Sequence, residues 1–121
     1  MLFKCVIVHD LDDARAALAP GRPVTLLSAP GAALFGGCLW WQALMREAGF
    51  GGVSLLDCGD APGRALEALR LGLPGIVLTC DPARFALVAA IGAGAVVLPA
   101  APAALDLGKR GARRHLTDWL G

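Results

Sequence analysis

The stretch Val53-Ser54-Leu55-Leu56-Asp57-Cys58-Gly59-Asp60-Ala61-Pro62-Gly63 decides the fold that the sequence predicts. It opens with an apolar run of the length of a buried strand and ends in an acid, a thiol, a glycine and a helix-start signal. Open parallel sheets usually bind their ligands at the carboxyl ends of such strands. We therefore expect Asp57 and Cys58 at a functional edge of a parallel sheet.

The same residues that end and begin helices recur along the chain. Glycine follows the helical stretches, as at Gly49 and Gly72, and a capping residue with a nearby proline opens the next helix, as at Asp81-Pro82. Apolar runs that alternate with helical patterns are typical of a parallel sheet packed against helices. The predicted strands lie near 4–8, 24–28, 53–57, 76–79 and 95–98, and the predicted helices near 11–18, 33–48, 63–71, 82–91 and within 107–120.

These elements predict a single α/β domain over residues 1–121, with a three-layer, doubly wound, flavodoxin-like arrangement around a five-stranded, mainly parallel sheet. The simplest strand order for such a sheet is 2-1-3-4-5. A piece of a β/α barrel is the alternative, although too few units are present to close one.

Composition limits the function. With 56% hydrophobic and 17% charged residues, the chain is too apolar to be disordered, and its surplus apolar surface favours self-association. A net charge of +1 gives no strong bias toward nucleic acid or an anionic membrane. Residues 85–105 carry no charge, but glycines and prolines interrupt them, so we expect no membrane span. Residues 1–10 lack a signal-peptide pattern, and we expect a cytoplasmic protein with reduced cysteines.

The predicted helix 33–48 is apolar nearly all round, whereas a helix that covers one face of a sheet needs only one apolar stripe. Trp40 and Trp41 point about 100° apart on a helix and cannot both face the sheet. We predict that Trp40, Trp41 and Leu44 form the interface of a homodimer. The alternative is that the C-terminal segment with Trp119 covers this helix.

Polar side chains gather at the predicted carboxyl edge of the sheet. In the order 2-1-3-4-5 the first and third strands are neighbours, so His9 and Asp10 would share a crevice with Asp57 and Cys58, with Thr79 at the end of the next strand. The carboxylates could hold a divalent cation or keep one acid protonated. The alternative is that Asp10 simply caps a helix.

Thiol chemistry is a second possibility at this edge. Cys38 in the first turns of helix 33–48 is the best nucleophile candidate, because a helix N-terminus lowers the pKa of a thiol. His9 could serve as a base for Cys58 or pair with Asp57. The alternative is that the cysteines are buried and behave as small apolar residues.

Some of these positions resemble response-regulator receiver domains. The similarity consists of an acid after the first strand (Asp10), an acid ending the third (Asp57), a hydroxyl ending the fourth (Thr79) and Pro99 after the fifth. Receivers have lysine where this chain has Leu98, so the resemblance implies at most a degenerate, receiver-like signalling domain.

We therefore expect a non-catalytic ligand-binding or protein-binding module that acts as a homo-oligomer and binds neither membrane nor nucleic acid. A small-molecule ligand would fit the predicted crevice, but the sequence identifies no cofactor and no resident metal. The alternatives are a small enzyme that uses Asp10, Asp57 and Cys58, or the receiver-like domain.

Overall fold

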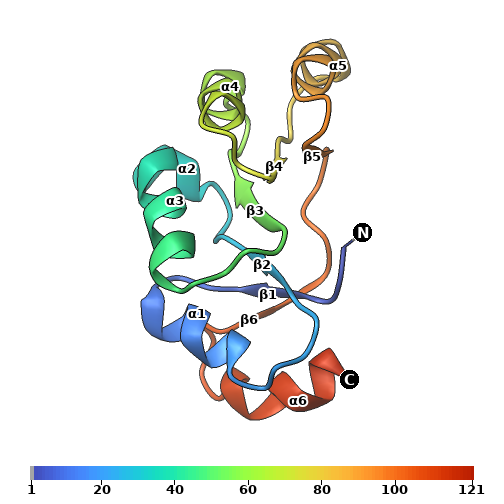
Figure 1. Ribbon diagram of the computed structural model, residues 1–121. Helices are drawn as coiled ribbons and strands as arrows, with labels where there is room; N and C mark the ends of the chain where they lie inside the picture. Colours follow the sequence, from blue (N-terminus) through green and yellow to red (C-terminus); the bar gives the residue numbers. More distant parts are fainter. Residues whose placement is uncertain (1) are drawn as a thin grey trace.

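The computed structural model describes residues 2–121, which form a parallel sheet flanked by helices (Figure 1). The strands are β1 (Cys5–Ile7), β2 (Thr25–Leu27), β3 (Ser54–Asp57), β4 (Gly75–Val77), β5 (Val96–Leu98) and β6 (Ala104–Asp106). The helices are α1 (Leu11–Leu18), α2 (Ala32–Phe35), α3 (Cys38–Glu47), α4 (Pro62–Arg70), α5 (Pro82–Ile91) and α6 (Leu116–Leu120), with a short 3-10 helix η1 (Ala112–His115) before α6. The predicted α/β class with a parallel sheet is confirmed, and so are all five predicted strands.

The sheet has six strands in the order β5-β4-β3-β2-β1-β6, and every neighbouring pair is parallel. The expected order 2-1-3-4-5 is wrong, because each strand–helix–strand unit from β1 to β5 places its second strand directly beside the first. Successive strands are added on the same side of the sheet from β1 to β5. The next strand, β6, is instead added at the opposite edge, beside β1. The point where the strand order reverses therefore lies between β1 and β6.

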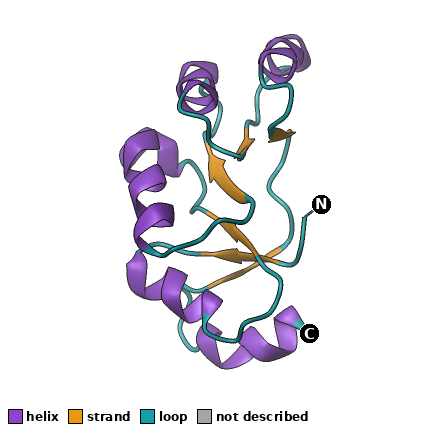
Figure 2. Ribbon diagram, viewed as in Figure 1, coloured by secondary structure: helices purple, strands orange, loops and turns teal. Residues whose placement is uncertain are grey.

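All of the helices described pack on the same face of the sheet (Figure 2). The main core contains side chains from the sheet together with side chains from each helix, and Trp41 is its largest fully buried member. A second core on the opposite face contains strand residues and their flanks but no helix residue. The expected helical layer on that face is absent from residues 2–121, because right-handed crossovers between strands that follow one another in order keep their helices on one side.

The helix-free face is nevertheless buried. Its central side chains, Cys5, Leu27, Leu55 and Val77, are at most 2% exposed. Six flat strands spaced about 4.8 Å apart would separate β5 from β6 by about 24 Å. The connection from Leu98 to Ala104 is six residue steps long and spans at most about 22 Å even when fully extended. The sheet must therefore curl, and its inner side chains bury one another, as in an unclosed barrel.

The predicted helix 33–48 is broken in two. Gly36 and Gly37 separate α2 from α3, and Gly37 adopts φ 86° and ψ 163°, a conformation open in practice only to glycine. A Cβ atom on Gly36 would lie 2.6 Å from Cε3 of Trp40. The two glycines thus end one helix and allow the next to start at a different angle over the sheet.

The C-terminal segment packs beside β1 and not over α3. The indole Nε1 of Trp119 donates a hydrogen bond to the carbonyl of Cys5 (2.8 Å), and Lys4 Nζ lies 4.4 Å from the centre of the Trp119 ring. The alternative in which Trp119 covers helix 33–48 is therefore wrong. No helix in residues 2–121 is both long and apolar enough to cross a membrane.

Candidate functional site

The predicted crevice between the first and third strands does not form. Strand β2 lies between β1 and β3, so His9 and Asp10 are separated from Asp57 and Cys58 by a whole strand. The prediction that Asp10 and Asp57 share a site is wrong, because the observed strand order separates them. The receiver-like interpretation loses its basis too, since it requires these two acids side by side.

Asp57 forms a local turn. Its carboxylate Oδ1 accepts a hydrogen bond from the backbone N–H of Gly59 (2.8 Å), and its own N–H donates to Ser28 Oγ (2.8 Å). An aspartate that bonds the backbone two residues ahead is a common turn former. The acid that ends β3 is thereby explained by the structure of the β3–α4 turn.

The thiols at this edge are buried. Cys58 is fully buried, and burial, with smaller contributions from Cys38, Asp57 and Glu67, raises the pKa of its thiol to about 12. Cys38 is the first residue of α3, as the nucleophile hypothesis requires, but burial and Glu67 raise its pKa to about 11. The expectation of a lowered pKa at this helix start is wrong, because desolvation outweighs the helix dipole. Both thiols are protonated at neutral pH.

Thr79 makes hydrogen bonds that hold loops at the edge of the sheet in place. Its hydroxyl donates a hydrogen bond to the carbonyl of Pro99 (3.0 Å), and its backbone N–H donates to the carbonyl of Gly59 (2.8 Å). The first bond fixes the start of the connection from β5 to β6. Thr79 is exposed, and within residues 2–121 no hydrogen bond joins it to His9 or Asp10.

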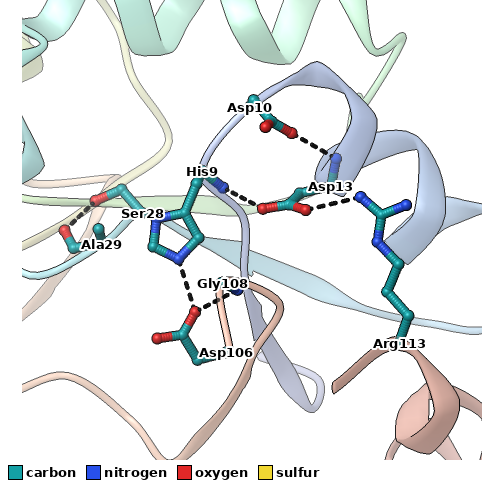
Figure 3. Close-up of polar contacts among 8 residues, drawn as sticks. All are labelled: His9, Asp10, Asp13, Ser28, Ala29, Asp106, Gly108 and Arg113. Atoms are coloured by element: carbon teal, nitrogen blue, oxygen red, sulfur yellow. Dashed lines mark hydrogen bonds and ion pairs between the residues drawn. The ribbon is translucent and has the colours of Figure 1, made fainter. Parts of the chain in front are cut away.

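The side chains that do meet at the carboxyl edge are His9, just after β1, and Asp106, at the end of β6 (Figure 3). His9 Nε2 lies 2.7 Å from Asp106 Oδ1, which also accepts a hydrogen bond from the backbone N–H of Gly108 (2.8 Å). The pair bridges β1 and β6, where the strand order reverses, and such reversal points are the usual ligand sites of open α/β sheets.

The carboxylate of Asp106 is held in its charged form. Burial acts to raise its pKa, but the hydrogen bonds from His9 and Gly108 outweigh it, so the pKa lies below its usual value. An ionised carboxylate only accepts hydrogen bonds, so Nε2 of His9 carries the shared hydrogen. The other ring nitrogen, Nδ1, points away from Asp106 in Figure 3. Gly108 is required beside the pair, because a Cβ there would lie 2.5 Å from His9 Nε2.

Asp10 caps α1, as the alternative interpretation expected. Its Oδ1 accepts a hydrogen bond from the N–H of Asp13 (2.8 Å), and Asp13 Oδ2 accepts one from the N–H of His9 (3.0 Å). Arg113 Nη2 then reaches Asp13 Oδ1 at 2.9 Å (Figure 3). This network ties the β1–α1 turn to the C-terminal segment and holds the backbone of His9 in place.

Asp106 is the residue that sequence reasoning missed. Ala104-Leu105-Asp106 is a short apolar run that ends in an acid, like Leu55-Leu56-Asp57 before it. That parallel is the one signal by which it could have been found. The predicted elements leave residues 99–106 unassigned, between the strand near 95–98 and the helix within 107–120.

The predicted interface residues divide between the core and the surface. Trp41 and Leu44 are buried against the sheet within the chain, whereas Trp40 is half-buried. The large apolar side chains that this segment exposes are its neighbours Leu34, Phe35 and Leu39. Trp41 and Leu44 are therefore unavailable to a partner, and dimerisation itself stays a prediction.

Residues 2–121 contain no group of three or more histidine, cysteine, aspartate and glutamate side chains placed to share a metal ion. Comparison with protein-family models, with curated proteins and with solved structures finds no match to this chain.

Proposed function

We propose that the chain is a protein-binding module whose partner is a second copy of itself. The contact is made by the α2–α3 patch, which consists of Leu34, Phe35 and Leu39. The observation that carries the proposal is that these side chains are 51%, 74% and 67% exposed. Residues 31–45, which contain the patch, include no charged residue.

The patch has the composition of an association surface. Large apolar side chains lose free energy when they leave water, at about 25 cal/mol for each Å² buried, and an exposed aromatic side chain is a common anchor. A second copy presents the same patch, so a two-fold contact pairs apolar surface with apolar surface. A net charge of +1 on each chain opposes this contact only weakly.

The patch on α2 and α3 is favoured over the exposed apolar side chains of α5. Leu87 and Ile91 are also exposed on α5, but they are two aliphatic residues without an aromatic anchor. The enzyme alternative is disfavoured because the Cys38 and Cys58 thiols have pKa values of about 11 and 12 and because Asp57 is engaged in its own turn.

The test is a series of amide NMR spectra of the ¹⁵N-labelled chain recorded over a dilution from millimolar to micromolar concentration. Signals of residues 34–40 should move on dilution, whereas those of Leu87 and Ile91 should not. The variant Phe35→Glu should abolish the movement, and the matched control Leu87→Glu should leave it unchanged. Spectra that do not change with concentration, from a protein whose molecular mass is that of one chain, would reject the proposal.

A further inference from the structure

A cavity of about 410 Å³, broadly open to solvent, lies beside the end of β1, where the start of α1 faces α3. Its lining consists of His9, Asp10, Leu11, Trp40, Ala43, Leu44 and Glu47. The volume falls within the range of small-molecule sites. The cavity uses none of the three side chains of the α2–α3 patch, so it can be tested apart from self-association.

One part of the cavity is apolar and well supported. Leu11 comes from α1, and Trp40, Ala43 and Leu44 come from successive turns of α3. The ring of Trp40 is held by its contact with Gly36 and by the ring of Trp41, whose centre lies 5.8 Å away. This surface suits a flat or branched hydrocarbon group.

The polar part of the cavity is acidic. Asp10 and Glu47 contribute carboxyl groups, and no lysine or arginine belongs to the lining. Asp10 uses one oxygen, Oδ1, to cap α1. Within residues 2–121 the carboxyl group of Glu47 has neither an ion pair nor a hydrogen bond. The lining thus presents two carboxyl groups and no basic side chain, although Arg113, which pairs with Asp13, also acts on Asp10 electrostatically.

His9 adds an imidazole ring to the same wall. Its Nε2 is committed to Asp106, so Nδ1 is the ring nitrogen without a partner within residues 2–121. Asp106 and Gly108 fix the ring, and the Asp10–Asp13 cap fixes the backbone that carries it. Because the carboxylates of Asp10 and Glu47 only accept hydrogen bonds, the complementary group is a donor with positive charge.

We propose that this cavity binds a small protonated organic amine with an apolar body. The body packs against Leu11, Trp40 and Ala43, and the ammonium group lies between Glu47 and Asp10. The indole ring of Trp40 adds the attraction that aromatic rings have for cations.

Benzylamine, which is protonated at neutral pH, is the probe, and benzyl alcohol and phenylacetate are its neutral and anionic matches. Binding is followed by the NMR signal of the Trp40 indole N–H. Benzylamine should bind with a dissociation constant in the range of about 0.1–3 mM, at least about fivefold tighter than benzyl alcohol, and phenylacetate should not bind. Glu47→Gln should weaken benzylamine about threefold to tenfold.

Two further variants keep the test decisive. Asp118→Asn removes an exposed acid on α6 and should leave the affinity unchanged, whereas Trp40→Leu should weaken benzylamine more than benzyl alcohol. Equal affinities for benzylamine and benzyl alcohol, or a Glu47→Gln variant that binds benzylamine as the wild type does, would overturn the inference. Glu47 lies outside the α2–α3 patch, so Glu47→Gln should not change the concentration dependence of the patch signals. Failure of amine binding can therefore be distinguished from failure of self-association.

Discussion

The two sides of the α2–α3 segment have similar composition, but one is buried and the other is exposed. Cys38, Trp41 and Met45 face the sheet and are buried, whereas Phe35 and Leu39 face solvent. Both sides consist of large apolar residues, so hydropathy alone does not separate them. The difference arises because Gly36 and Gly37 break the helix and set the rotation of α3 over the sheet. Apolar residues left outside after the core is full are available for association.

The largest effect should come from the buried side. Trp41→Ala empties the space of the largest fully buried side chain and should lower the free energy of unfolding by about 3–5 kcal/mol, as large cavities in cores do. Leu39→Ala on the exposed side should change it by less than about 0.5 kcal/mol. Urea unfolding followed by circular dichroism measures both. Equal losses for the two variants would contradict the division of the segment into two sides.

A second variant separates the indole ring from its N–H group. Trp41 Nε1 is buried and has no hydrogen-bond partner within residues 2–121. Trp41→Phe removes this donor and keeps most of the apolar contact, so its cost should be smaller than that of Trp41→Ala. A greater loss in Trp41→Phe would show that the N–H group stabilises the fold.

The break between the helices should be the next most sensitive point. Gly36→Ala places a Cβ 2.6 Å from the Trp40 ring and should cost about 1–3 kcal/mol, as overpacking does. The φ of Gly36 is −91°, so the backbone itself accepts alanine. The control Gly63→Ala lies in the first turn of α4 with open space around it and should stabilise the chain by about 0.4–1 kcal/mol. Thermal melts of the two variants should therefore shift in opposite directions.

The smallest effect should be at the exposed polar pair, where water competes with the contact. The side chains of His9 and Asp106 are 36% and 25% exposed, so Asp106→Asn should cost at most about 1 kcal/mol at pH 7. The pKa of Asp106 is lowered in the folded chain, so its stabilisation is present above the unfolded value of about 3.9 and is lost as the pH falls through the folded value. The melting temperatures of wild type and variant should converge on acidification. A difference that persists unchanged to pH 2 would contradict an electrostatic origin.

Local structure could be predicted closely from the sequence. The bounds of α1 and α5 match the predicted helices, and Asp10 and Asp81 cap them as their residue types indicate. The bond from Asp10 to Asp13 joins residues three apart, and Asp81 bonds Arg84 in the same way. Such short-range contacts depend on neighbouring residues alone, which is why the pattern of residue types is enough to predict them.

The long-range arrangement could not be predicted. His9 meets Asp106 only because β6 returns to the free edge of β1, and these residues are 97 positions apart. No helix separates β6 from β5, so β6 lacks the alternation of strand and helix that identifies the other strands, and without it the reversal point of the sheet falls in the wrong place. The burial of Trp41 and the exposure of Phe35 likewise depend on the helix break, which the continuous apolar pattern conceals.

Self-association through the exposed side of this segment is tested most directly by light scattering during size-exclusion chromatography. The wild-type chain at high micromolar concentration should have twice the mass of one 12.4 kDa chain. The double variant Phe35→Glu with Leu39→Glu should elute as a folded monomer with an unchanged circular dichroism spectrum. A monomeric wild type, or a double variant that keeps the dimer mass, would contradict the account.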